Sequence, residues 1–312
     1  MKRFSLVIAC LALAAGPLLA DKPHPNHSAP QAVNTISGTP LTIVIGDDTA
    51  MQIYNSAVVS NPPNSGQFYP GDTAPGETAE AGIFVRPAGG VTYGASSVGV
   101  GGGSFTPVSM TPVTGTGTAG DPFKVVVVVG IPTTSVQMTE TMTYVNGDTA
   151  AKIGLSFVGD GNPVVNLDAF IGVDLYLAGN DRGFSFASTA GAGGQGADTN
   201  CLILQYKISL LGTTPANRYS ANGYSQNWSE IAAGMLSNTS DPACIDNGAS
   251  LQWTGLAVGT TPVVVNTGTS FTGQLVPVGA VVPALSPKAI AALVLLLAAV
   301  GYVLARKTSL GA

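Results

Sequence analysis

Charged residues are scarce in this sequence of 312 residues, where they make up 9% of the total. An ordinary soluble domain has roughly 25%. Disorder of the whole chain is excluded, because disorder requires few apolar and many charged residues, whereas 45% of these residues are hydrophobic. Lysine and arginine number 12 against 17 acidic residues, which gives a net charge of −5. We therefore expect no nucleic-acid partner, since such partners select a basic surface.

Histidine is nearly absent as well. The only two, His24 and His27, lie in a Pro-rich segment, residues 21–32, that we expect to be flexible. A histidine-dependent triad and a histidine-rich zinc site are therefore excluded from the body of the chain. The stretch 191–196 matches G-x-G-x-x-G, but we expect it to be a loop that opens no helix, so it holds no dinucleotide. We expect no catalytic residue, no bound metal and no cofactor.

The N-terminus has the pattern of a secretory signal peptide. Lys2 and Arg3 precede an apolar run that ends in small residues, and we expect cleavage after Ala20, so that residues 1–20 are removed. An alternative is a lipoprotein signal, in which Cys10 becomes acylated. The export machinery and signal peptidase are the partners that this segment predicts.

The C-terminus predicts a single transmembrane helix. Residues 289–305 carry no charge and are followed at once by Arg306 and Lys307. At 1.5 Å per residue such a helix is about 25 Å long, near the lower limit for a bilayer core. A buried core helix is the alternative. The positive-inside rule keeps Arg306 and Lys307 in the cytoplasm as the membrane stop and places the body on the other side.

A short motif precedes this apolar stretch. It consists of Val282, Pro283, Ala284, Leu285 and Ser286. Together with the helix and the basic end, residues 282–312 resemble the IPTL-CTERM type of sorting signal of Gram-negative bacteria, which is related to the PEP-CTERM signals. The resemblance implies processing by an exosortase-like membrane protease. It also implies a place in the bacterial cell envelope, either in the inner membrane with a periplasmic body or on the outer surface after processing. A plain tail anchor is the alternative.

Alternation of apolar and polar residues recurs through residues 33–281 and predicts a large antiparallel β-sandwich, an all-β fold. The clearest example has apolar side chains on one face at Leu167, Ala169, Ile171, Val173, Leu175 and Leu177. Residues 61–120 are rich in Gly, Ser and Pro and predict an irregular or linker-like region. The run 125–129 consists of valine alone, which predicts a strand covered on both sides. Only residues 225–236 have helical spacing.

Several segments resemble large β-sandwich domains of bacterial surface proteins, some of them mutarotase-like supersandwiches. They are GTAGDPF at 117–123, YVNGD at 144–148, DLYLAGNDRGF at 174–184 and DNGASLQW at 246–253. This second resemblance implies a fold and an extracellular setting, and no activity.

Two cysteines remain once the leader is removed. Cys201 and Cys244 are expected to form a disulfide, because export leads to an oxidising compartment. Two separate buried thiols are the alternative. Closing this loop contributes roughly 4 kcal/mol in the chain-entropy model.

Aromatic and acidic side chains supply the remaining candidates. Tyr224 and Trp228 lie close together and are the candidates for stacking on a sugar ring, with core packing as the alternative. Asp174 and Asp181 flank a turn and are the candidates for a two-carboxylate glycosidase site. The candidate oxygen ligands for Ca²⁺ are Asp160, Asn162, Asn166 and Asp168. The alternative is that they are ordinary turn residues that bind no ion.

Three functions follow from these features. The first is an exported, membrane-anchored or sorted envelope protein with a structural or adhesive role and no catalysis. The second is a carbohydrate-binding surface module that uses Tyr224 and Trp228. The third is an exported hydrolase that works through carboxylates. The sequence names no surface ligand.

Overall fold

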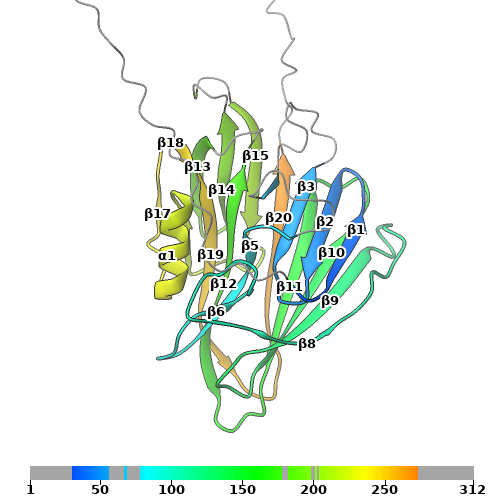
Figure 1. Cartoon of the computed structure of the whole chain (residues 1–312), viewed down its shortest axis with the longest axis vertical. Coiled ribbons are helices and arrows are strands. Elements are labelled where there is room, and N and C mark those ends of the chain that lie inside the picture. Colours follow the sequence, from blue (N-terminus) through cyan, green and yellow to red (C-terminus); the bar gives the residue numbers. More distant parts are fainter. Residues whose placement is uncertain are drawn as a thin grey trace, which may run out of the picture.

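The computed structural model describes residues 30–55, 67–68, 78–177, 182–197, 201 and 204–272. Two large sheets face each other in this part of the chain, which confirms the predicted all-β sandwich (Figure 1). The predicted signal peptide and residues 282–312 lie outside the described ranges. Nothing helical within those ranges has the length and apolar character of a membrane span.

The larger sheet has 11 strands. They are β1 (Val33–Ser37), β2 (Leu41–Gly46), β3 (Met51–Asn55), β4 (Gln67–Phe68), β5 (Ala81–Pro87), β6 (Tyr93–Gly94), β7 (Gly103–Ser104), β12 (Val165–Tyr176), β16 (Arg218–Ala221), β17 (Thr239–Ser240) and β19 (Gly248–Val258). Their main order is β1-β2-β3-β4-β12-β19-β16-β17. On the side away from β19, β12 pairs with β5 along most of its length and with β4 at its end.

The smaller sheet has nine strands in the order β18-β13-β14-β15-β20-β11-β10-β9-β8. They are β8 (Thr106–Met110), β9 (Phe123–Gly130), β10 (Gln137–Tyr144), β11 (Ala150–Val158), β13 (Arg182–Ser188), β14 (Gly191–Ala197), β15 (Leu204–Leu211), β18 (Cys244–Asp246) and β20 (Val263–Thr272). Residues 61–120, expected to be irregular, include β4 to β8.

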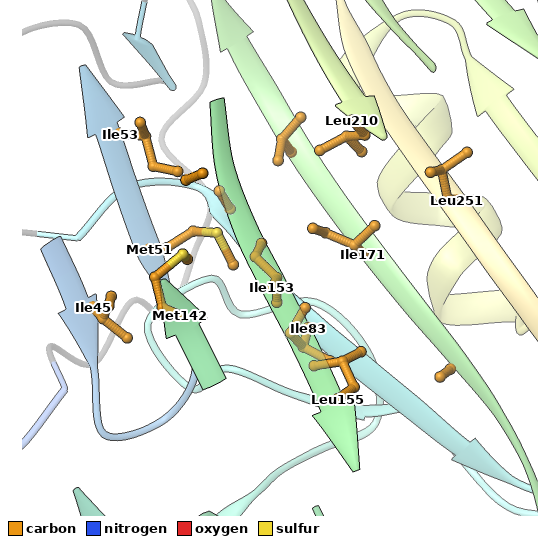
Figure 2. Close-up of a cluster of buried hydrophobic side chains, with 14 of the residues drawn as sticks. Ile45, Met51, Ile53, Ile83, Met142, Ile153, Leu155, Ile171, Leu210 and Leu251 are labelled. Carbon is orange, nitrogen blue, oxygen red and sulfur yellow. The ribbon is translucent and has the colours of Figure 1, made fainter. Parts of the chain in front are cut away.

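Period-two alternation builds the core between the sheets. The apolar set from Leu167 to Leu175 on β12, together with Leu177 just after the strand, faces inward and is buried, as its spacing predicts. Figure 2 shows this interior, with Ile45 and Met51 of the larger sheet near Met142 and Ile153 of the smaller one. Strands such as β10 have a single apolar face, because only one of their faces meets the other sheet.

Two local predictions are wrong. Residues 125–129 are not covered on both sides, since Val125, Val127 and Val129 are buried whereas Val126 and Val128 are only half-buried. The glycine-rich stretch 191–196 is no loop, because it belongs to β14, which is paired with β13 and β15. Hydrogen bonds to two neighbours hold a strand here despite the low strand propensity of glycine.

The helix α1 (Tyr224–Ala233) lies on the outer face of the larger sheet and matches the one helix that the sequence predicts. It ends at Gly234, whose φ of 80° is left-handed and favours glycine. Trp228 and Ile231 pack with Phe84 and Phe170 in a second, smaller apolar cluster outside the main core. The helix and residues 95–100 therefore cover the apolar part of the outer face.

Side chains of the larger sheet and of the connection between β5 and β6 bind the C-terminal end of α1 and the segment that follows it. Arg86 donates to the carbonyl of Ala233, and Arg218 donates to that of Leu236 at 2.9 Å. The Thr92 hydroxyl donates to the Ile231 carbonyl at 2.9 Å. The bonds from Arg86 and Thr92 satisfy carbonyls of the last turn of α1, and the bond from Arg218 holds the segment that follows the helix, so α1 is held at a defined position on the sheet.

A disulfide joins Cys201 to Cys244, as predicted, with the two Cα atoms 6.1 Å apart. Cys244 begins β18, which pairs with β13 at the edge of the smaller sheet. Cys201 lies between β14 and β15. The bond therefore attaches the edge strand to the connection between two inner strands.

Candidate functional site

Polar side chains form two adjacent rows on the outer face of the larger sheet, at the ends of β3, β4 and β12. In the first row Tyr54 lies opposite Gln67, and Gln67 lies opposite Tyr176. The neighbouring residues Ile53, Phe68 and Leu175 are in the core, so this row points outward. Both tyrosines are half-buried, whereas Gln67 is buried.

Two carboxylates form the second row. Val173 of β12 pairs with Ala81 of β5, and the Asp174 amide donates to the Glu80 carbonyl at 2.8 Å. Asp174 and Glu80 are therefore opposite each other. Both point outward, because the flanking alanines Ala79 and Ala81 and the residues beside Asp174 belong to the core. Opposite residues in an antiparallel pair have Cβ atoms about 4.5–5.5 Å apart.

Both carboxylates are buried, with exposures of 6% for Glu80 and 1% for Asp174. Charged side chains are seldom buried so completely without a specific reason. A carboxylate removed from water is stabilised by groups that donate hydrogen bonds to it or that carry positive charge.

The first turn of α1 forms a wall beside this pair. Gly248 lies opposite Asp174 on the other side of β12. A Cβ atom on Gly248 would lie 2.8 Å from the Tyr224 Cα and 2.9 Å from the Asn227 Nδ2, so only glycine allows the helix to approach this closely. The positive end of the helix dipole therefore lies next to Asp174, which favours negative charge there.

Asn227 fixes the start of α1 over the sheet. Its Nδ2 donates to the Asn222 carbonyl at 3.0 Å, and its Oδ1 accepts a hydrogen bond from the Ser250 hydroxyl at 3.2 Å. All three residues are buried. Fully bonded buried amides restrain their surroundings, so the wall beside Asp174 is held rigidly.

The two predicted sugar-stacking residues differ in exposure. Trp228 is 4% exposed, and its ring centroid lies 5.9 Å from that of Phe84. Tyr224 is half-buried and packs against the edge of the same cluster. Tyr224 therefore flanks the carboxylate pair from the helix side, while Tyr54 and Tyr176 flank it from the sheet side.

The predicted calcium ligands do not come together. Asp160 lies in the turn between β11 and β12, and its Oδ1 accepts hydrogen bonds from the Asn162 amide at 3.0 Å and the Ser135 hydroxyl at 2.7 Å. These bonds hold the pKa of Asp160 below its ordinary value. Asp168 accepts from Gln252 and from the Gly255 amide instead. The described residues contain no group of three or more metal-binding side chains.

Of the other predicted residues, Asp181 lies outside the described ranges, as do the sorting motif from Val282 to Ser286 and the membrane stop at Arg306 and Lys307. Asp174 is at the site. Glu80 was not among the candidates from the sequence, because it is isolated in a Gly- and Pro-rich region and only the pairing of β5 with β12 brings it to Asp174.

No protein-family model and no curated relative matches the sequence. Among solved structures, a bacterial glucoamylase complexed with acarbose aligns over 80% of this chain with 11% identity and a TM-score of 0.46. An aldose 1-epimerase from Escherichia coli aligns over 78% of this chain and 99% of its own length, with 10% identity and a TM-score of 0.41. A heparan sulfate lyase from Pedobacter heparinus aligns over 80% with 8% identity and a TM-score of 0.40.

This chain spans about a third of the length of the glucoamylase, 33%. The expectation of a non-catalytic protein with a structural or adhesive role is wrong, because these neighbours and a kojibiose phosphorylase are all enzymes that act on carbohydrate. With TM-scores of 0.46 and below, they assign neither activity nor substrate to this chain. Any assignment must come from the residues of the site.

Proposed function

We propose that this chain binds carbohydrate on the outer face of its larger sheet, at the site defined by Tyr54, Tyr176, Glu80, Asp174 and Tyr224. The observation that carries the proposal is the pair of opposed carboxylates beside the row of tyrosines. A sugar ring presents hydroxyl donors around its rim and C–H groups on its faces. Carboxylates accept hydrogen bonds from the former, and planar aromatic rings pack against the latter.

The experiment is glycan-array binding by the full chain, followed by titration of the glycan that binds. We expect Tyr176→Ala to weaken binding about tenfold, because it removes one ring without exposing the core. The matched control is Phe186→Ala. Phe186 is a half-buried aromatic on the outer face of the other sheet, under the Lys207 ammonium, and its removal leaves the site unchanged.

Trp228→Ala is a poor test of the same idea. Trp228 is almost fully buried, so its truncation costs about 3–5 kcal/mol of stability and loosens α1 whether or not sugar binds. Equal affinity of wild type and Tyr176→Ala for the same glycan contradicts the proposed site. Binding of no glycan by the wild type contradicts the proposed function.

We also propose that the chain is exported, loses residues 1–20 to signal peptidase and is anchored through residues 289–305 in the cell envelope, with processing near Pro283 by an exosortase-like enzyme. The disulfide supports an oxidising compartment. Intact-mass measurement of protein from membrane and medium fractions is expected to show the loss of the leader, and a shortened C-terminus in the processed form. Full-length protein in the cytosol contradicts the proposal.

A further inference from the structure

We propose that the outer face of the smaller sheet binds an acidic polysaccharide through Lys124, Lys152 and Lys207, a surface separate from the proposed site on the larger sheet. The charged residues in the nine strands of this sheet are Lys124, Glu140, Lys152, Arg182, Lys207 and Asp246. The glutamate is buried in the core, and the arginine lies opposite the aspartate at the edge strand β18. Three lysines therefore set the charge of this face, although the whole chain has a net charge of −5.

Lys124 and Lys152 lie in one row across the sheet. Thr143 of β10 pairs with Lys124 of β9 on one side and with Lys152 of β11 on the other. Their neighbours Val125 and Ile153 are in the core, so both lysines point outward, and both are exposed. Two strand spacings of about 4.8 Å put the Cα atoms of the lysines roughly 10 Å apart.

Lys207 lengthens this row into a basic track. Lys152 pairs with Gly268 of β20, and Gly268 pairs with Leu211, four residues along β15 from Lys207. Strand geometry then puts the Cα atoms of Lys152 and Lys207 roughly 16 Å apart. The Lys207 ammonium lies 4.0 Å from the centre of the Phe186 ring, and this cation–π contact holds it at the surface of the sheet. A track of this length matches a polymer with a charge on repeated units better than a single small anion.

The three lysines are available to a ligand. None of them forms an ion pair with a carboxylate of the described residues. The acidic residues nearest to Lys124 and Lys152 along the chain, Asp121 and Asp148, lie in the turns that precede β9 and β11. The Asp121 Oδ2 accepts a hydrogen bond from the Thr116 amide instead. A face with charges of one sign attracts a ligand of the opposite sign.

The surface between the lysines favours a polysaccharide among the possible polyanions. Thr139 and Thr141 of β10 and Ser156 of β11 are half-buried on the same face, and their hydroxyls can donate to and accept from sugar hydroxyls. The helix α1 packs against β12 and β19 of the larger sheet, so no helix of the described residues covers this face (Figure 1). Membranes and protein partners are bound largely through protruding aromatic side chains. The aromatic residues of β9, β10 and β11 all point toward the core.

Fluorescence anisotropy of the full chain with a labelled alginate oligosaccharide, a polyuronate, tests the inference. We expect the double variant Lys124→Gln, Lys152→Gln to bind about tenfold more weakly than the wild type, because two exposed charge pairs are lost. Wild-type affinity should also fall between about 0.01 M and about 0.15 M salt, since the Debye length shrinks from about 30 Å to about 8 Å. Both lysines are exposed, so the variant is expected to unfold at the same urea concentration as the wild type.

The matched control is the double variant Lys124→Arg, Lys152→Arg, which keeps both charges and is expected to keep wild-type affinity. Dextran, a neutral polysaccharide, is not expected to compete with alginate. Tyr176→Ala is expected to leave alginate binding unchanged, because Tyr176 lies on the larger sheet.

Three results overturn the inference: no binding of alginate by the wild type, equal affinity of the wild type and the glutamine variant, or loss of binding in Tyr176→Ala. Vesicles of phosphatidylglycerol that bind more tightly than alginate through the same lysines overturn it too, since the face is then a membrane surface. The proposed site on the larger sheet is tested separately by the array titration, so its failure and the failure of this inference are distinguishable.

Discussion

Replacement of Glu140 by methionine is expected to stabilise the protein by several kcal/mol at pH 8. Glu140 lies on β10 and points into the core between the sheets, where it is 1% exposed. Neither carboxyl oxygen has a hydrogen-bond partner among the described residues. A buried polar group without a partner costs about 1–3 kcal/mol, and an ionised one costs more.

The effect depends on pH. Burial, with a smaller contribution from the negative charge of Asp48, raises the pKa of Glu140 from 4.5 to about 8. The folded state then holds a proton that the unfolded state releases, so stability falls as pH rises from about 4.5 to about 8. At about 1.4 kcal/mol per pKa unit, the total loss is of the order of 5 kcal/mol.

Urea denaturation at pH 5, 6, 7 and 8 measures this prediction. The wild type is expected to lose stability across the series relative to Glu140→Gln, whose neutral amide does not titrate. Glu140→Met removes both the titration and the unpaired group, and it should be the most stable of the three at pH 8. Parallel curves for wild type and Glu140→Gln would show that Glu140 does not gain a proton on folding.

Loss of the disulfide is expected to cost about 4 kcal/mol in the double variant Cys201→Ser, Cys244→Ser. The bond closes a loop with a sequence separation of 43, and in the chain-entropy model such a crosslink restricts the unfolded chain by about that amount. The edge strand β18 has only three residues, so its backbone pairing with β13 is short without the bond.

Urea denaturation with and without reductant measures the effect. Reductant is expected to lower the stability of the wild type to that of the double variant. The stability of the double variant should not change, and this controls for other effects of the reductant. Alkylation of both cysteines in the untreated wild type contradicts the bond. Equal stability of wild type and variant in the absence of reductant contradicts its contribution.

The sequence predicts the sandwich well where alternation is regular. Residues from Leu167 to Leu177 have one apolar face, because the side-chain period of a strand is two, and that face is the core. The prediction fails at residues 191–196, since glycine carries no side chain from which a period can be read. Glu140 was recognisable: it stands between Met138 and Met142 on the inward-facing positions of its strand.

The site is harder to predict than the fold. Asp174 is identifiable as a polar residue on an apolar strand, but its partner Glu80 depends on which strand lies beside β12. Pairing between distant strands is set by the packing of the whole sheet, and short-range patterns do not encode it. The sequence likewise does not show that Tyr54 and Tyr176 lie in one row, because their strands are joined only through the two-residue strand β4.

Because helix α1 is rigid, a displacement of one of its ends also moves the other end. Its 10 residues span about 15 Å, with Tyr224 beside Asp174 at one end. At the other end Arg86 binds the last carbonyl of the helix, and Arg218 binds the carbonyl of Leu236 just after it. A change at either arginine would tilt the helix and shift the aromatic ring at its far end. Laboratory evolution toward new ligands is therefore expected to accumulate substitutions at Arg86 and Arg218, although neither contacts the ligand.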